Sequence, residues 1–196
     1  MATYGRVRVN NGKYRIAGDF HQLDPRLPIR NADDGDRLCG ITNPRQMTYM
    51  HSYGAEAPFF EALGQKKLLA SRCDAPGCES RGAMYLPFRI FCPDCLARNS
   101  IVDVTDKARQ SARVYTFMVC ERSGAFNLLA KPIKFINIEF EGIDTILMSY
   151  LSLGEPSIGL QVLPIFRAQD PTFTILDLSW VPRGTPADAL PEGFAL

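Results

Sequence analysis

Four cysteines in one short stretch carry the clearest chemistry of this sequence. They form two pairs, Cys73 with Cys78 and Cys92 with Cys95, and thirteen residues separate the pairs. Thiolates from two tight turns can surround one tetrahedral ion, and zinc suits four sulfur ligands at about 2.3 Å. The sequence therefore predicts one zinc ion bound by these four cysteines.

The two pairs differ in their spacing. Cys92-Pro93-Asp94-Cys95 has the spacing of a metal knuckle, and Pro93 stiffens the turn. The first pair has four intervening residues, in which Pro76-Gly77 bends the loop. No histidine or carboxylate in the pattern marks an open coordination position, so we expect a structural metal rather than a catalytic one.

Three other interpretations of the cysteines are disulfide bonds, a redox dithiol and an iron site. The chain opens Met-Ala-Thr-Tyr-Gly-Arg without an apolar signal segment, which predicts a cytoplasmic protein and disfavours disulfides. A redox dithiol at Cys92 and Cys95 usually lies in a βαβ pattern, which this sequence does not show. Iron accepts four thiolates as zinc does, and it stays open as the alternative metal.

Composition excludes several classes of protein. The chain has 196 residues, of which 46% are hydrophobic and 22% charged, as in folded soluble domains. No apolar run reaches the length of a membrane span. The formal charge of +1 gives no overall basic field that would attract nucleic acid. Only two histidines are present, His21 and His51, which limits acid–base chemistry near neutral pH.

The order of elements predicts a mostly β protein. Residues 1–53 are expected to form an N-terminal extension that begins with a hairpin over 4–17 and lies over its own core or a partner. His21, His51 and Cys39 fall in this extension, and we interpret each as a surface or packing residue.

Residues 54–100 are expected to form a short helix followed by a zinc ribbon. The helix, over 54–65, has an apolar face containing Phe59, which we interpret as core, and Gly64 is placed for a C-terminal cap. Strands over 68–72 and 84–91 would lead into the two cysteine knuckles. So small a unit would depend on its metal for much of its folding energy.

Residues 101–182 are expected to form a small barrel of the oligonucleotide/oligosaccharide-binding (OB) type, because short strands follow one another without a long helix. Cys120 is interpreted as a packed residue within a strand. Residues 183–196 are expected to be a tail or a docking arm. The predicted strands cover 101–104, 112–120, 133–140, 144–151, 160–166 and 172–180.

This order resembles a known family. The motifs that carry the resemblance are Arg72-Cys73, Leu86-Pro-Phe-Arg89, Cys92-Pro-Asp-Cys95 and Ile158-Gly-Leu-Gln-Val162. They resemble the acyl-CoA-associated family with an N-terminal zinc ribbon and a C-terminal OB fold, whose members accompany thiolases as a second subunit. The resemblance spans residues 55–167.

The resemblance implies that Cys73, Cys78, Cys92 and Cys95 are the metal ligands. The first pair departs from the family, in which two intervening residues are usual. A narrower resemblance is to the accessory subunit of the benzoylsuccinyl-CoA type of thiolase, which acts in anaerobic toluene degradation.

The preferred functional hypothesis is a non-catalytic subunit that assembles with a thiolase or thiolase-like subunit acting on acyl-CoA. The partner would supply the nucleophilic cysteine and the bases, and acyl-CoA would bind at the interface. The sequence has no nucleophile elbow, phosphate loop or dinucleotide fingerprint, and we assign no catalytic residue to it.

Two alternatives come from other classes. A nucleic-acid-binding module would use stacking aromatics, with Phe117, Phe135, Phe140 and Tyr150 as candidates, but the low net charge argues against it. A stand-alone acyl-CoA-binding protein would hold the phosphates through arginines around the ribbon, although solvated surface charges are the simpler interpretation. The arginine candidates are Arg72, Arg81, Arg89 and Arg98.

Overall fold

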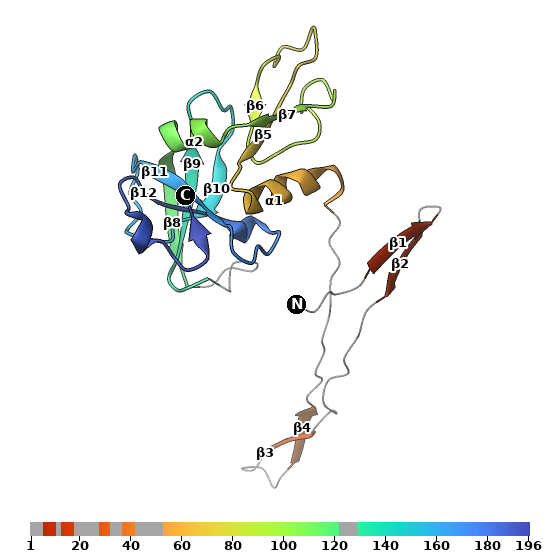
Figure 1. Ribbon diagram of the computed structural model, residues 1–196. Helices are drawn as coiled ribbons and strands as arrows, with labels where there is room; N and C mark the ends of the chain where they lie inside the picture. The colour runs from red at the N-terminus through yellow and green to blue at the C-terminus, as the bar shows by residue number, and fades with distance from the viewer. Residues whose placement is uncertain (1–5, 11–12, 18–27, 32–36, 42–52, 122–128) are drawn as a thin grey trace. The chain divides into compact units, whose positions relative to one another are not determined.

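A computed structural model describes residues 6–10, 13–17, 28–31, 37–41, 53–121 and 129–196 (Figure 1). The chain divides into two units, Met1–Ser52 and Tyr53–Leu196. Among the described residues, none of the helices combines the length and the apolarity needed to cross a bilayer.

The N-terminal unit contains two strand pairs. Strands β1 (Arg6–Asn10) and β2 (Lys13–Ala17) pair antiparallel, over the residues where the sequence predicts a hairpin. A second antiparallel pair, β3 (Pro28–Asn31) and β4 (Arg37–Ile41), lies where the sequence pattern was irregular. Cys39 belongs to β4, whereas His21 and His51 lie outside the described residues.

The second unit begins with a 3-10 turn, Gly54–Glu56, and helix α1 (Ala57–Gly64). Phe59 is buried, as the sequence predicts for a core residue. The cap differs from the prediction, because Gly64 is still helical and packs near Pro171. Lys66, two residues later, takes the left-handed conformation with φ 61° that was expected of a glycine.

A three-stranded sheet forms the base of the ribbon, in the order β6-β5-β7. Its strands are β5 (Leu69–Arg72), β6 (Met84–Tyr85) and β7 (Ser100–Asp103). The strand predicted over 84–91 therefore ends early, at Tyr85, since Pro87 has no N–H to continue a ladder. Residues 101–104 were predicted as a barrel strand, and this is wrong: β7 pairs with β5 instead.

Helix α2 (Thr105–Ser111), which the sequence analysis did not predict, connects the ribbon to the barrel. The Asp103 carboxylate accepts hydrogen bonds from the Thr105 backbone N–H and hydroxyl, which fixes the start of the helix. Ala108 is fully buried, so this short helix packs its one small apolar residue into the core.

The barrel consists of five strands that close on themselves. Two antiparallel sheets, β8-β9-β10 and β11-β12 with β13 at the edge, are joined by bridges at Arg113–Gln161 and Leu151–Trp180. The circuit therefore runs β8-β9-β10-β12-β11 and back to β8, which confirms the small OB-type barrel. The strand bounds are β8 Arg113–Cys120, β9 Ile133–Glu139, β10 Leu147–Tyr150, β11 Val162–Arg167, β12 Leu178–Pro182 and β13 Phe194–Ala195.

The expected elements near the C-terminus need two corrections. The strand predicted over 172–180 begins only at Leu178, because Ile175–Asp177 forms a 3-10 turn. Residues 183–196 do not stand free, since β13 pairs with β11 and the Arg167 guanidinium lies 5.0 Å from the centre of the Phe194 ring. This pairing covers part of the β11 edge.

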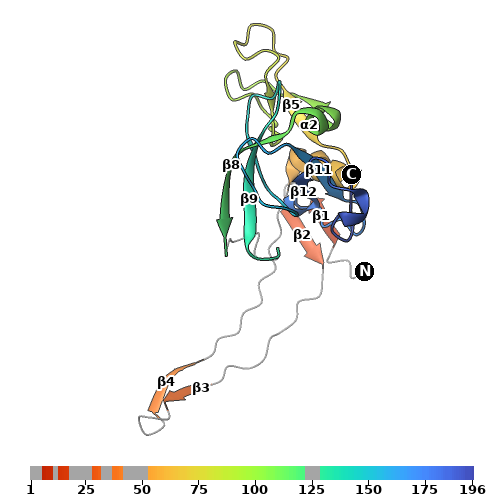
Figure 2. The same cartoon turned by 90° about the vertical axis from the view of Figure 1, so that its left-hand side faces the viewer.

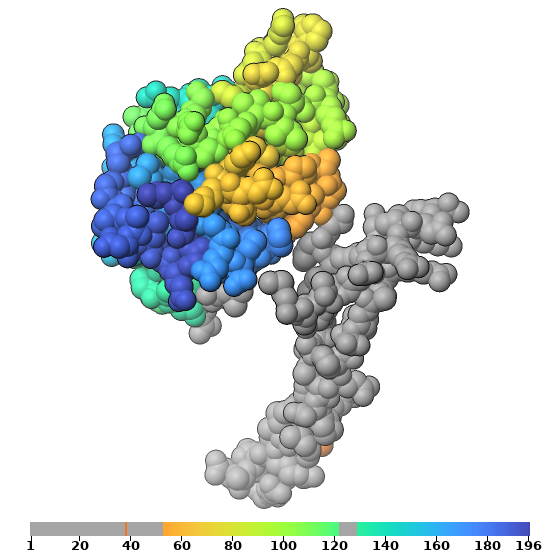
Figure 3. Space-filling model, in the orientation of Figure 1, coloured from red at the N-terminus to blue at the C-terminus, as the bar shows by residue number. Residues whose placement is uncertain are grey.

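One hydrophobic core runs through helix α1, the base of the ribbon and the barrel. Trp180 and Phe166 are its largest fully buried side chains. A separate small cluster of Cys73, Tyr85 and Cys92 lies inside the ribbon. Figures 1 and 2 show β8 and β9 running side by side, and Figure 3 shows the cysteine loops of the ribbon projecting beyond the rest of this unit.

Candidate metal centre

The first cysteine knuckle follows directly after β5. Cys73 is the first residue after the strand, and its carbonyl accepts a hydrogen bond from the Gly82 N–H at 2.7 Å. The Cys78 N–H donates to the Ala75 carbonyl across a turn in which Gly77 has φ 84°. Because a residue with a side chain is strained at such an angle, the glycine lets this wider loop fold back toward Cys73.

The second knuckle is a tight turn closed by its own backbone. The Leu96 N–H donates to the Cys92 carbonyl at 3.0 Å, and the Cys92 N–H donates to the Ala97 carbonyl at 2.9 Å. Leu96 has φ 58°, the left-handed conformation that usually falls to glycine. The two knuckles are also joined by a hydrogen bond from the Ser80 hydroxyl to the Asp94 carboxylate.

The four sulfur atoms lie together, within 4.8 Å of one another. The Cys73–Cys95 sulfurs are 3.8 Å apart and the Cys78–Cys92 sulfurs 3.9 Å. A regular tetrahedron with metal–sulfur bonds of about 2.3 Å has edges of about 3.8 Å. The cysteines could therefore hold one metal ion, and the geometry is consistent with zinc.

The arrangement bears on the competing interpretations. All four cysteines are free thiols, and each short sulfur–sulfur distance joins a cysteine of one knuckle to a cysteine of the other. Cys92 and Cys95 thus belong to a four-sulfur set rather than to a separate dithiol. In the described part of the chain, no other group of three or more histidine, cysteine or acidic ligands converges.

Local hydrogen bonds and burial shift the pKa values of Cys92, Cys78 and Cys73 in different directions. The backbone N–H groups of Cys95 and Asp94 stabilise the Cys92 thiolate and lower its pKa to about 6. Burial raises the pKa of Cys78 to about 12. For Cys73 the Ala75 backbone favours the thiolate, but burial and the neighbouring thiols outweigh it and raise the pKa. Four thiolates this close together repel one another, and a bound divalent ion would offset that repulsion with its positive charge.

Side chains around the knuckles hold the ribbon in place. Asp74 accepts a hydrogen bond from the Arg72 guanidinium at 2.7 Å and another from the Ser100 hydroxyl, and these bonds lower its pKa. The Tyr85 hydroxyl lies 3.7 Å from the Cys92 sulfur, and burial raises the pKa of Tyr85 to about 12. The Arg89 guanidinium lies 5.7 Å from the centre of the Tyr85 ring.

Sequence reasoning missed the residues that fasten the ribbon to the barrel. The loop between β9 and β10 supplies Asp144, whose carboxylate accepts a hydrogen bond from the Met84 N–H at 2.8 Å. Thr145 follows it, and its hydroxyl accepts from the Leu86 N–H and donates to the Leu86 carbonyl, both at 2.7 Å. No local sequence signal identifies these contacts, because they join residues about sixty positions apart.

The remaining candidates are placed as follows. Cys120 ends β8, far along the chain from the knuckles, and is partly exposed. Among the four aromatics considered for stacking bases, Phe117 is 41% exposed, whereas Phe135, Phe140 and Tyr150 are buried. Of the arginines considered for acyl-CoA phosphates, Arg72 is paired with Asp74 and Arg89 lies over Tyr85.

No family model matches the chain, and no curated protein matches its sequence. A solved structure from Sulfolobus solfataricus, described as a protein with unknown function from the DUF35 family, is 25% identical in sequence. It superposes with a TM-score of 0.45 over 64% of this chain and 82% of that chain. At this TM-score the likeness carries no inference about function.

Proposed function

We propose that this chain is a non-catalytic subunit, stabilised by one zinc ion, that assembles with a thiolase or thiolase-like subunit acting on acyl-CoA. The partner makes or breaks the carbon–carbon bond, and this chain helps to shape the site. The sequence motifs at Arg72-Cys73, Leu86–Arg89 and Cys92–Cys95 support this class of partner through their family resemblance. The benzoylsuccinyl-CoA type of thiolase is the first partner to test.

The observation that carries the proposal is the four-sulfur cluster. Four thiolates fill a tetrahedral ion, so the metal keeps no position for water or substrate and acts as a structural element. Cys120 is the one thiol outside the cluster among residues 53–121 and 129–196, and we assign it no catalytic role. The chemistry of an acyl-CoA reaction would therefore come from another subunit.

Exposed apolar side chains on the ribbon offer a surface for such a partner. Leu96 is 74% exposed, Phe91 56% and Ile101 51%. Leu96 combines this exposure with a left-handed backbone, which costs about 1–2 kcal/mol for a residue with a Cβ, while most of its side chain stays uncovered by the described residues. An apolar side chain held out at this cost is typical of an interaction site.

The test is reconstitution with the large subunit of a benzoylsuccinyl-CoA thiolase. We expect a stable complex by light scattering and about one zinc per chain by elemental analysis. Thiolysis is expected only in samples that contain the large subunit. The large subunit alone and this chain alone are the controls. Turnover of an acyl-CoA thioester by this chain alone would contradict the proposal, and so would failure to bind any thiolase-like subunit.

A further inference from the structure

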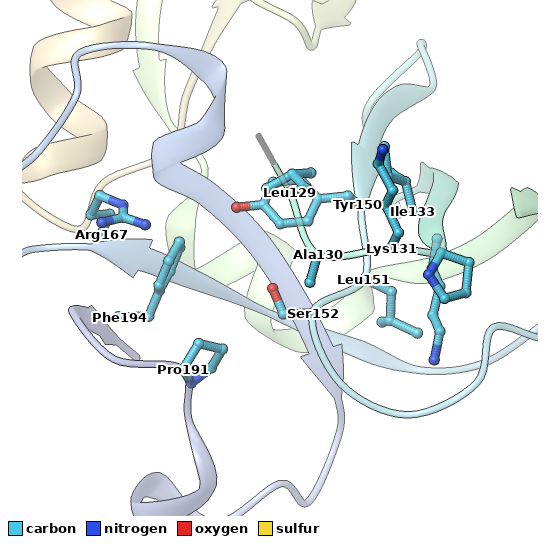
Figure 4. A pocket seen from close by; sticks show the side chains of 12 residues that line it. Leu129, Ala130, Lys131, Ile133, Tyr150, Leu151, Ser152, Arg167, Pro191 and Phe194 are labelled. Carbon is cyan, nitrogen blue, oxygen red and sulfur yellow. The ribbon is translucent and has the colours of Figure 1, made fainter. Parts of the chain in front are cut away.

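A cavity of about 430 Å³ opens where β9 begins and β10 and β11 end (Figure 4). This volume lies within the range of small-ligand sites. The cavity is bounded by the connection that leads into β9 and by the end of β11, and loops at this place carry the ligand sites of OB barrels in general. Its lining residues are Leu129–Lys134, Tyr150–Ser152, Arg167, Pro191 and Phe194.

The charges around the cavity are of one sign. Lys131, Lys134 and Arg167 line it, and no acidic residue does. Lys134 is already paired, since its ammonium lies 2.6 Å from the Glu155 carboxylate and donates to the Gly154 carbonyl. Lys131 is exposed, and among the described residues no carboxylate lies within ion-pair distance of it. Arg167 lies 3.9 Å from the Asp177 carboxylate, so Lys131 is the lining cation that has no paired carboxylate among the described residues.

Arg167 supplies an unused donor. Its Nε is buried and has no hydrogen-bond partner among the described residues. The nearest carboxylate oxygen, on Asp177, is 3.9 Å away, too far for a hydrogen bond. Asp177 is itself satisfied by the Thr172 N–H and hydroxyl and by the Phe173 N–H. The Nε–H is thus held inside the chain, and the outer part of the guanidinium, on a side chain that is 36% exposed, is what an occupant of the cavity would meet.

Beside the cations, the lining combines apolar side chains with the polar Tyr150 and Ser152. Figure 4 shows Arg167, Phe194 and Pro191 on one side of the cavity and Ile133 with Lys131 on the other. The Phe194 ring is fixed by the Arg167 guanidinium, which lies 5.0 Å from its centre. An occupant would thus meet a cation at one end and apolar or aromatic surface along its body.

We propose that this cavity binds a small organic anion, a carboxylate or a phosphate ester with an apolar body. The anion pairs with the accessible part of the Arg167 guanidinium, whose side chain is 36% exposed, Lys131 attracts the charge from the rim, and the body lies against Phe194 and Ile133. This inference does not depend on the thiolase-type partner, because the cavity is formed by the barrel strands and the C-terminal segment of this chain alone.

The proposal is tested by calorimetric titration of benzoate or phenyl phosphate into the full-length protein. Benzyl alcohol, which has the same ring without the charge, is the control ligand. We expect at least one anion to bind at millimolar concentration or tighter, with an affinity that falls as salt is raised. Preference for one head group separates a carboxylate ligand from a phosphate ester.

Variants identify the site. Arg167→Gln should weaken anion binding by about tenfold and Lys131→Gln by about threefold, because each removes a charged partner. Lys66→Gln, an exposed lysine outside the cavity, is the matched control and should bind as the original protein does. The Lys131 side chain is exposed, so its replacement should leave the fold intact. The Lys131 variant therefore remains informative if Arg167→Gln fails to fold.

Three results would overturn the proposal. The first is that neither anion binds at millimolar concentration. The second is that benzyl alcohol binds as tightly as the anions, or that both cavity variants bind like the original protein. The third is that a short single-stranded oligonucleotide binds while both small anions fail, which would assign this end of the barrel to nucleic acid.

Discussion

Asp144 and Met84 exchange two hydrogen bonds: the Met84 N–H donates to the Asp144 carboxylate, and the Asp144 N–H donates to the Met84 carbonyl, both at 2.8 Å. Met84 begins the ribbon strand β6, and Asp144 lies in the loop between two barrel strands. The pair therefore joins the cysteine-bearing ribbon to the barrel by two directed hydrogen bonds, in addition to apolar packing.

Asp144→Ala should loosen this junction. Loss of the carboxylate leaves the Met84 N–H without its acceptor and should lower the free energy of unfolding by about 1 kcal/mol. Hydrogen exchange is the sharper measurement, because the Met84 amide should lose protection while amides of β11 and β12 keep theirs. Glu141→Ala, an exposed acidic residue in the same loop, is the control. Unchanged protection at Met84 would show that the bond is not formed in solution.

Cys92→Ser should abolish metal binding. The variant removes one of four ligands, the thiol whose pKa is lowered to about 6, so the content of zinc should fall from about one ion per chain to near zero. Elemental analysis and near-ultraviolet circular dichroism would measure the metal and the ribbon fold. Cys120→Ser removes a thiol outside the cluster and should keep its zinc. Equal metal content in both variants would refute the four-cysteine site.

Leu96→Gly should separate folding from assembly. Glycine tolerates the φ of 58°, so the variant should keep its metal and gain up to about 1 kcal/mol of stability. The lost side chain should nevertheless weaken the thiolase-type complex by about tenfold, because a leucine contact contributes about 1.5 kcal/mol or more when buried. Ile158→Gly is the control, since Ile158 is 73% exposed on another loop. Undiminished binding by Leu96→Gly would remove the ribbon tip from the interface.

Tyr150→Phe tests a buried phenol of the barrel. Burial raises the Tyr150 pKa from 10.0 to about 12, and the hydroxyl donates to the Leu176 carbonyl at 2.9 Å. Because the folded state favours the neutral phenol, the associated stability is fully present below pH 10 and is lost as the pH rises through 12. An absorbance titration of the tyrosines should show a late component from Tyr85 and Tyr150, which becomes smaller in Tyr150→Phe because only Tyr85 then remains in it. A late component of unchanged size would contradict this assignment.

The sequence predicts the convergence of the cysteines well, and the structure confirms that the four sulfurs lie together. Residue type and short spacing suffice there, because a knuckle is a local turn. That the cysteines bind zinc stays a prediction. The closed OB-type barrel is also confirmed, since alternation of apolar residues marks strands such as Ile133–Glu139 wherever they pair.

Other features depend on contacts that a local pattern does not encode. Residues 101–104 are rich in β-branched residues, as a strand of either sheet would be, and only the ladder with Leu69–Arg72 assigns them to the ribbon sheet. Helix α2 is short and polar, so it gives a weak periodic signal. The unused donor of Arg167 becomes visible only when the end of β11, Asp177 and the C-terminal Phe194 are brought together in space.

The coupling between ribbon and barrel has a consequence for the order of synthesis on the ribosome. All four cysteines have been synthesised once Cys95 is added, whereas Asp144 and Thr145 are added later and the barrel closes only when Leu178–Pro182 is available. The nascent ribbon therefore has its four thiols before the barrel residues Asp144 and Thr145 are present to bind it. The metal ligands of the ribbon are therefore complete before the barrel that holds the ribbon can close.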